Sequence, residues 1–119
     1  MRVIAGAERG ITLKTPEGLR TRPTAERVKE GLFSAIQFEI PGTRVLDLFA
    51  GTGQLGIEAL SRGARDAVFV DMGADACRLV RENLQRTGLT GRAQVVQADY
   101  LRYLERRERP GGIIFLDAP

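Results

Sequence analysis

The sequence predicts an α/β fold in which helices cover both faces of a parallel sheet. From residue 44 onward, short apolar runs alternate with stretches of helical periodicity, and glycines mark several of the boundaries. The apolar runs are nearly continuous, as the strands of a parallel sheet are when both faces are buried. Because such crossovers are right-handed, the sheet is expected to be doubly wound, within one domain of 119 residues.

The first expected element is a β-hairpin. R-V-I-A-G at residues 2–6 and I-T-L-K at 11–14 are short strand-like runs, and a Glu-Arg-Gly turn at 8–10 joins them. Two prolines and a glycine then keep the stretch at 15–23 irregular.

A helix is expected next, over residues 24–37. Thr24 can cap its start, and a glutamate follows in the first turn. Val28, Leu32 and Ile36 recur every four residues and predict the buried face of this helix. A Pro-Gly pair ends the segment.

Four strands and three helices complete the expected order. The strands are predicted at residues 45–49, 67–71, 93–97 and 112–117, and the helices between them at 54–62, 74–87 and 100–108. Gly63 and Gly88 are expected to stop the first two of these helices. In the second, the inward residues are predicted to be Ala76, Leu79, Val80 and Leu84, with Cys77 as a core residue.

Composition restricts the chemistry. The chain has no histidine and one cysteine, so it lacks the commonest general base and a thiol metal cluster, and we expect no metal. No apolar run approaches membrane-spanning length and no signal peptide is visible, so we expect a cytoplasmic protein without a membrane partner.

The charge is unevenly distributed. Residues 1–44 hold 8 Lys and Arg against 5 Asp and Glu, whereas residues 45–119 hold 10 of each, and 16 of the 18 cations are arginine. Arginine suits bidentate phosphate contacts, so a nucleic-acid partner is one interpretation. The other is that the small excess has no functional meaning and that the abundance of arginine reflects a GC-rich genome or a thermophilic source.

The richest motif is D-L-F-A-G-T-G-Q-L-G-I-E-A-L at residues 47–60. An apolar strand enters a G-x-G-x-x-G turn, and an acid, Asp47, lies inside the strand. Asp71, Asp99 and Asp117 end or follow the other three strands. Because ligands of such sheets bind beyond the carboxyl ends of the strands, these acids are expected along one ligand-binding edge.

These acids bear on the kind of ligand. Asp71 can accept hydrogen bonds from ribose hydroxyls, which suits NAD and S-adenosylmethionine equally. Asp47 would repel a pyrophosphate and favour a cationic ligand, and Asp99 could accept a hydrogen bond from an adenine amino group. Alternatively, Asp47 is a buried carboxylate that binds the N–H groups of its own loop.

The motif resembles motif I of the class I S-adenosylmethionine-dependent methyltransferases, which implies a Rossmann-like sheet. R-V-I-A-G at 2–6, T-R-P-T-A-E-R-V-K-E-G-L-F-S at 21–34 and F-L-D-A-P at 115–119 narrow the resemblance. Together they resemble the bacterial family that methylates the exocyclic N2 of one guanine in 16S ribosomal RNA. The resemblance covers the whole chain in order.

The resemblance implies a role for each matching residue. Residues 44–119 would be the S-adenosylmethionine-binding core and residues 1–43 an RNA-facing extension. The implied cofactor-binding residues are Asp47, Ala50, Gly51, Thr52, Gly53, Gly56, Asp71, Met72, Ala98 and Asp99. The implied substrate- or RNA-binding residues are Arg2, Arg9, Arg20, Arg22 and Thr24, and the implied catalytic residues are Asp117, Ala118 and Pro119.

The chain departs from the family pattern at its end. The family has a D/N-P-P-Y/F turn after strand four, whereas this chain reads D-A-P and stops. We therefore expect the N-terminal portion of a longer enzyme, with strands one to four of an incomplete sheet. Strand four would then be an apolar edge open to self-association.

The implied partner is 16S ribosomal RNA or an assembling small ribosomal subunit. Alternatives are methylation of another amine, such as adenine N6 or a protein glutamine, and a cofactor- or RNA-binding fragment without turnover. An NAD-dependent dehydrogenase fits the residues least well.

Overall fold

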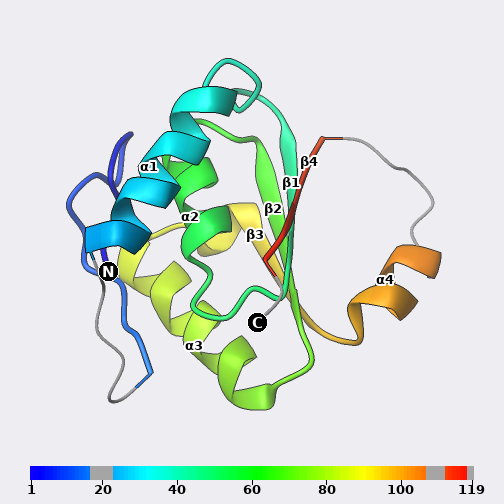
Figure 1. The fold of residues 1–119 in the computed structure, drawn as a ribbon. Helices are drawn as coiled ribbons and strands as arrows, with labels where there is room; N and C mark the ends of the chain where they lie inside the picture. Colours follow the sequence, from blue (N-terminus) through cyan, green and yellow to red (C-terminus); the bar gives the residue numbers. More distant parts are fainter. Residues whose placement is uncertain (17–22, 107–111, 118–119) are drawn as a thin grey trace.

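The computed structural model describes residues 1–16, 23–106 and 112–117 of the chain. Its centre is a four-stranded sheet with the order β3-β2-β1-β4 (Figure 1). The strands are β1 (Arg44–Leu48), β2 (Asp66–Asp71), β3 (Ala93–Gln97) and β4 (Ile113–Leu116), and all neighbouring pairs are parallel. The predicted doubly wound parallel sheet is confirmed.

Helices lie on both faces of this sheet because successive strand residues point to opposite sides. The helices are α1 (Pro23–Ile36), α2 (Gln54–Ser61), α3 (Ala74–Thr87) and α4 (Tyr100–Arg106). Val45, Phe69 and Phe115 pack with residues of α1, α2 and α3, whereas Leu46 and Val70 pack toward α4 (Figure 1). A short 3₁₀ turn, Thr90–Arg92, leads into β3. No helix among the described residues is both long and apolar enough to cross a membrane.

The predicted buried face of α1 is wrong at two of its three residues, whereas Ile36 packs against the core as predicted. Val28 and Leu32 are 67% and 38% exposed, whereas their neighbours Lys29 and Phe33 are buried. Phe33 packs on Phe115 with ring centroids 5.5 Å apart. The Lys29 ammonium meets a carboxylate inside the protein, so a polar residue occupies a position that periodicity assigned to solvent.

α1 begins one residue earlier than predicted. The helix begins at Pro23, so Thr24 lies within its first turn. Proline suits this first position because it has no N–H to satisfy and its φ is already helical.

The N-terminal hairpin is smaller than predicted. One antiparallel bridge joins Arg2 and Thr12, and the N–H of Val3 donates to the carbonyl of Ile11 (3.0 Å). Regular strands do not continue because the N–H groups of Ile4 and Ala5 donate elsewhere, to the Glu58 carboxylate of α2 (2.8 and 3.1 Å).

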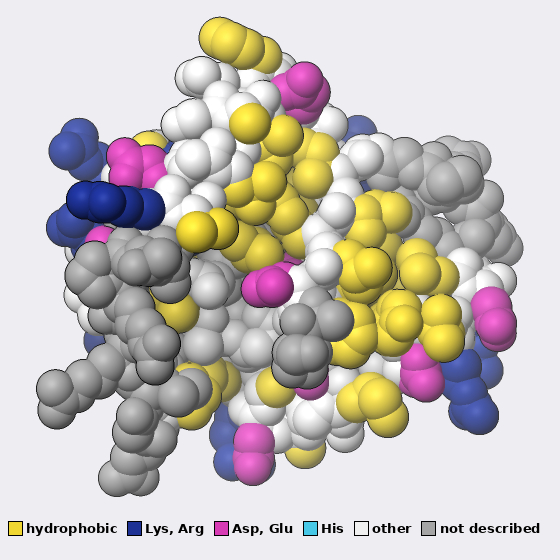
Figure 2. Space-filling model, in the orientation of Figure 1, with side chains coloured by type: hydrophobic (Ala, Val, Ile, Leu, Met, Phe, Trp, Pro, Cys, Tyr) yellow, Lys and Arg dark blue, Asp and Glu magenta, His cyan; other side chains and the backbone are white. Residues whose placement is uncertain are grey.

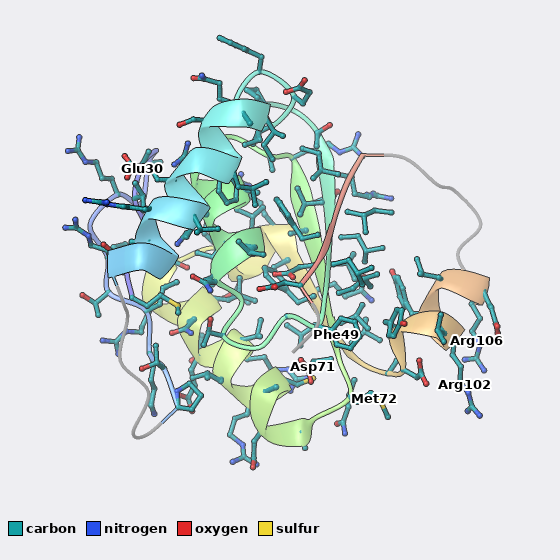
Figure 3. The ribbon with its side chains drawn as sticks, viewed as in Figure 1. Glu30, Phe49, Asp71, Met72, Arg102 and Arg106 are labelled. Carbon is teal, nitrogen blue, oxygen red and sulfur yellow. The ribbon has the colours of Figure 1, made fainter. Side chains whose placement is uncertain are left out.

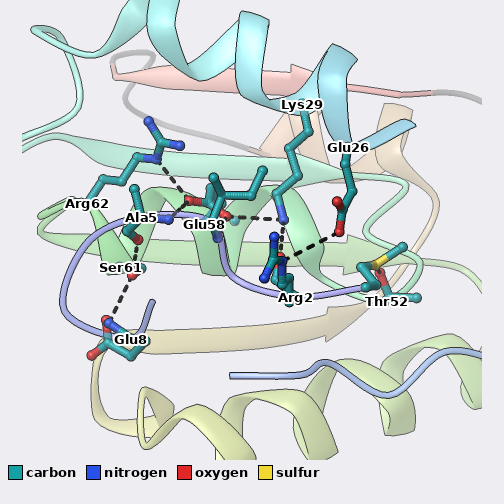
Figure 4. Close-up of polar contacts among 12 residues, drawn as sticks. Arg2, Ala5, Glu8, Glu26, Lys29, Thr52, Glu58, Ser61 and Arg62 are labelled. Atoms are coloured by element: carbon teal, nitrogen blue, oxygen red, sulfur yellow. Dashed lines mark hydrogen bonds and ion pairs between the residues drawn. The ribbon is translucent and has the colours of Figure 1, made fainter. Parts of the chain in front are cut away.

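Glu58 anchors this N-terminal segment, residues 1–14, to the helices (Figure 4). Its fully buried carboxylate contacts Lys29 Nζ (3.1 Å) and Arg62 Nε (2.9 Å). Burial alone would raise the pKa of Glu58, but the hydrogen bonds from Ile4, Arg62 and Ala5 and the charge of Lys29 hold that pKa below its usual value. Burial lowers the pKa of Lys29, and Glu58 partly offsets this effect.

The remaining elements agree closely with the sequence-based boundaries. Gly88 ends α3 in the left-handed region, with φ 71°. Val80, Leu84 and Cys77 of α3 are buried as predicted, whereas Ala76 and Leu79 are half-buried. β1 ends one residue earlier than predicted because Phe49 turns into the left-handed region at φ 58°.

Candidate ligand site at the carboxyl edge of the sheet

The carboxyl ends of the strands bring the predicted site residues together. The glycine turn of residues 49–53 follows β1, Asp71 ends β2, Asp99 follows β3 and Asp117 follows β4. Figure 3 shows Phe49, Asp71 and Met72 around this edge, with α4 beside them. The topology therefore creates the single edge that the sequence predicted.

Asp47 lies behind the glycine turn. Its side chain is 1% exposed, and Oδ2 accepts a hydrogen bond from the N–H of Gly56 (3.1 Å). Burial raises the pKa of Asp47 to about 7, and the negative charges of Asp117 and Asp71 add to the effect. This geometry is the alternative considered for Asp47, a buried carboxylate that binds its own loop.

Asp71 joins the two loops at the centre of the edge. Its Oδ2 accepts from the N–H of Gly51 (3.2 Å), and its Oδ1 accepts from the N–H of Gly73 (2.9 Å). The N–H of Ala98 donates to the Asp71 backbone carbonyl (3.1 Å), which adds the loop after β3. One half-buried acid therefore orders three loops.

The three glycines of the motif have different roles. Gly51 and Gly53 adopt φ values of 60° and 81°, which make the turn possible. Gly56 lies in α2, and a Cβ there would come within 2.3 Å of the Phe69 ring on β2. Gly56 is thus required for close packing of helix on sheet.

Aromatic side chains form one wall of the edge. The Phe49 ring packs on Tyr100 with centroids 4.6 Å apart and planes inclined at 50°. Phe49 was predicted to belong to the strand, and no local signal in the sequence indicates its left-handed backbone. Met72 is exposed beside Asp71 (Figure 3).

Asp99 starts α4. Its Oδ1 accepts a hydrogen bond from the N–H of Leu101 (2.8 Å), and its carbonyl accepts from the N–H of Tyr103 (3.0 Å). It also lines a cleft of about 560 Å³, whose other walls are Met72, Val96, Gln97, Ala98, Arg102, Tyr103 and Arg106. A cleft of about 570 Å³ at the opposite, amino-terminal edge includes Arg44, Asp66 and Arg92 but none of the predicted site residues.

The predicted RNA-binding residues are only partly described. Arg2 is exposed, and its Nε lies 3.8 Å from Oε1 of Glu26 in α1 (Figure 4). Arg9 is exposed on the turn of the N-terminal hairpin. Arg20 and Arg22 lie outside the described residues, as do Ala118 and Pro119. Asp117 is described and exposed.

Two polar residues near the site were not identified from the sequence. Glu58 and Asn83 are both fully buried, and each binds the backbone of the N-terminal segment. Asn83 lies at a core-facing position of α3. A polar residue at a position where helical periodicity predicts an apolar one is the sequence feature that could have identified it.

The chain matches a known protein family over its whole length. The model of the family described as conserved hypothetical protein 95 matches residues 1–119. "Putative rRNA methyltransferase YlbH" of Bacillus subtilis is 48% identical over the whole chain, and "Ribosomal RNA small subunit methyltransferase D" of Escherichia coli is 38% identical. The chain covers 66% and 60% of these two proteins, less than two thirds of either.

A solved structure shows the same arrangement. "Putative methyltransferase yhhF from Escherichia coli" superposes with a TM-score of 0.88 at 39% identity, over all of this chain and 64% of the other. The sequence-based family resemblance is confirmed by these matches. With its whole length matched by one family model, the chain belongs to the family described as conserved hypothetical protein 95.

Proposed function

We propose that this chain is the cofactor-binding part of an S-adenosylmethionine-dependent methyltransferase that modifies the exocyclic N2 amine of a guanine in 16S ribosomal RNA. The observation that carries the proposal is the use of two N–H groups, one in the glycine turn and one in the first turn of α2. Gly51 and Gly56 donate to the carboxylates of Asp71 and Asp47, so these two N–H groups are not available to a phosphate. The names of the relatives support methylation of ribosomal RNA.

The anionic edge favours a cationic ligand over a dinucleotide. A pyrophosphate would meet Asp71 and Asp117, and two N–H groups that could compensate its charge, those of Gly51 and Gly56, already donate to carboxylates. S-adenosylmethionine carries a sulfonium and no phosphate. Asp71 would hold its ribose, the turn at Ala50–Gly53 its methionine portion, and Met72, Ala98 and Asp99 its adenine.

The chain's own contribution to the reaction is alignment and charge stabilisation. Bound S-adenosylmethionine would supply a methyl group already activated by positive sulfur. The guanine amine is a weak nucleophile, so Asp117 would accept a hydrogen bond from it and stabilise positive charge growing on nitrogen. In the proposal Ala118 offers its carbonyl to the same amine and Pro119 shapes the turn.

The substrate is proposed to approach from the N-terminal side. Arg2, Arg9, Arg20 and Arg22 would contact RNA phosphates, and Thr24 would lie near the target. The charge excess within residues 1–44 supports this side of the molecule. Naked RNA and an assembling subunit are both compatible substrates, and we expect cytoplasmic action because ribosomal RNA is the proposed target.

Binding and transfer test the proposal separately. Calorimetry with S-adenosylhomocysteine should detect a complex, and an excess of NAD should not displace it. Radiolabelled methyl transfer to 16S RNA, followed by nucleoside analysis, should yield N2-methylguanosine. Tight NAD binding, or no binding of S-adenosylhomocysteine, would contradict the cofactor assignment.

Two other functions give different outcomes in the same assays. Methyl transfer to adenine in DNA or to a glutamine peptide, with none to RNA, would indicate another amine as substrate. Binding of the cofactor without transfer to any of these would indicate a binding module. The names of the relatives favour ribosomal RNA as the substrate over both alternatives.

A further inference from the structure

Asn83 connects three segments that meet beside the glycine turn. Its Oδ1 accepts a hydrogen bond from the N–H of Lys14 (2.7 Å), and its Nδ2 donates to the carbonyls of Lys14 (2.9 Å) and Thr52 (2.9 Å). The side chain is 0% exposed. A primary amide offers both an acceptor and two donors, so Asn83 satisfies all three backbone groups at once.

The glycine turn is therefore held from two sides. Asp71 of β2 binds the N–H of Gly51, and Asn83 of α3 binds the carbonyl of the next residue, Thr52. The other two bonds of Asn83 fix Lys14, at the end of the N-terminal segment. Asn83 thus links the turn to the end of the segment, and a contact of the Thr52 hydroxyl with Met1 Sδ (3.4 Å) joins the turn to the start of the segment.

A cleft lies between these two segments. It measures about 470 Å³, and its walls are the end of the N-terminal segment, the glycine turn and the exposed face of α3. Lys14 Nζ closes part of the rim through an ion pair with Glu82 of α3 (3.0 Å). A change in the Asn83 bonds would move both the turn and the opposite wall of this cleft.

We propose that Asn83 is a positioning residue for cofactor binding, acting through the Thr52 carbonyl and the Lys14 backbone. The inference rests on the proposed function, since it requires the glycine turn to hold the cofactor. Asn83 itself is fully buried and would act without contacting the cofactor. It keeps the turn in the binding geometry, so its loss weakens the cofactor complex more than it weakens the fold.

Two variants test this role. N83D keeps the acceptor for Lys14 N–H but loses both donors, and N83L loses all three hydrogen bonds. We expect N83D to raise the Kd for S-adenosylhomocysteine about tenfold at pH 8, because the carbonyls of Lys14 and Thr52 lose their donor. S-adenosylhomocysteine lacks the positive sulfonium of S-adenosylmethionine. The carboxylate that N83D introduces therefore cannot strengthen binding by attracting that charge. N83D carries the test if N83L is too unstable to purify.

The matched control is T87V, one turn further along α3. The Thr87 hydroxyl is also buried, but it donates only to carbonyls of its own helix, Asn83 (2.9 Å) and Leu84 (3.1 Å). We expect T87V to lower the Tm while leaving the Kd within twofold of wild type. Lowering the pH should partly restore the affinity of N83D relative to wild type, because a protonated carboxyl regains one donor.

The possible results distinguish failure of the Asn83 role from failure of the proposed function. Equal Kd values for wild type, N83D and T87V would overturn the role of Asn83 while leaving the proposed function intact. If N83D and T87V weaken S-adenosylhomocysteine binding equally, Asn83 has only a structural role, and the proposed positioning role is overturned too. If the wild-type chain binds no S-adenosylhomocysteine, the proposed function fails and this inference fails with it.

Discussion

Asp47 is an acid whose burial makes the stability of the fold depend on pH. Its folded pKa of about 7 lies above the ordinary 3.8, so the folded chain keeps a proton that the unfolded chain has lost between these values. The free energy of unfolding should therefore fall as the pH rises from about 4 to 7. D47N removes this dependence, and its amide oxygen can still accept from Gly56 N–H.

We expect D47N to be more stable than wild type at pH 8, by about 2 kcal/mol, and to flatten the pH dependence. Urea unfolding at pH 4, 6 and 8 measures both effects. D75N is the control, because Asp75 is an exposed acid on α3 that forms an ion pair with the exposed Arg78. Parallel pH profiles for D47N and wild type would show that Asp47 ionises normally.

Replacing Glu58 should lower the free energy of unfolding more than replacing its buried ion-pair partner, Lys29. E58Q leaves the Lys29 ammonium buried without a counter-charge, so we expect a loss of about 3 kcal/mol at pH 7. K29M should cost less, because Glu58 keeps Arg62 and two backbone N–H donors. Because Glu58 has a lowered pKa, its contribution is present above the usual glutamate pKa and lost as the pH falls through the folded value.

Urea unfolding of both variants at pH 7 measures the difference. A K29M variant that is less stable than E58Q would contradict this account of the pair, because it would mean that the ammonium contributes more than the carboxylate it neutralises.

At the scale of the elements, packing of α2 on β2 depends on the absence of a side chain at Gly56. G56A would place a Cβ 2.3 Å from the buried Phe69 ring, so we expect a loss of about 1–3 kcal/mol from overpacking. G31A is a control in α1, where nothing lies within 4 Å of the added Cβ. It should stabilise by about 0.5–1 kcal/mol through helix propensity.

The thermal midpoints of the two glycine variants should therefore move in opposite directions. A rise in Tm for G56A would mean that Phe69 and α2 move apart without cost, and the packing role of Gly56 would be wrong.

At the scale of the whole molecule, β4 is an outer strand of the sheet. Within residues 1–16, 23–106 and 112–117, no strand pairs with the outer edge of β4. Ile114 and Leu116 of β4 are exposed on the face that α4 covers elsewhere, and apolar side chains gather there on the surface (Figure 2). Such an edge is open to pairing with another chain.

We propose that two copies of the 119-residue chain associate through this β4 edge. Light scattering at increasing concentration should show a rising mass for wild type, and I114K should shift the chain toward monomer, because a charge blocks edge pairing. F38K is the matched control, since Phe38 is an exposed apolar residue outside the sheet. Monomeric wild type at high concentration would refute the association.

The sequence by itself determined the order of the elements, the parallel sheet, the glycine turn and the acids at the strand ends. These features depend on local periodicity and on short motifs, which adjacent residues encode. The same motifs were sufficient to identify the family. Strand and helix boundaries followed within a few residues, because glycines and polar residues mark them.

Only the tertiary structure decided which residues pair across the chain. Periodicity could not show that Lys29 replaces Val28 on the buried face, because the reason is Glu58, in a different helix. Asn83 bonds to Lys14, 69 positions away, and Asp47 binds Gly56 rather than facing outward. A buried polar group is stable only with its partners in place, and those partners come together only when distant segments pack.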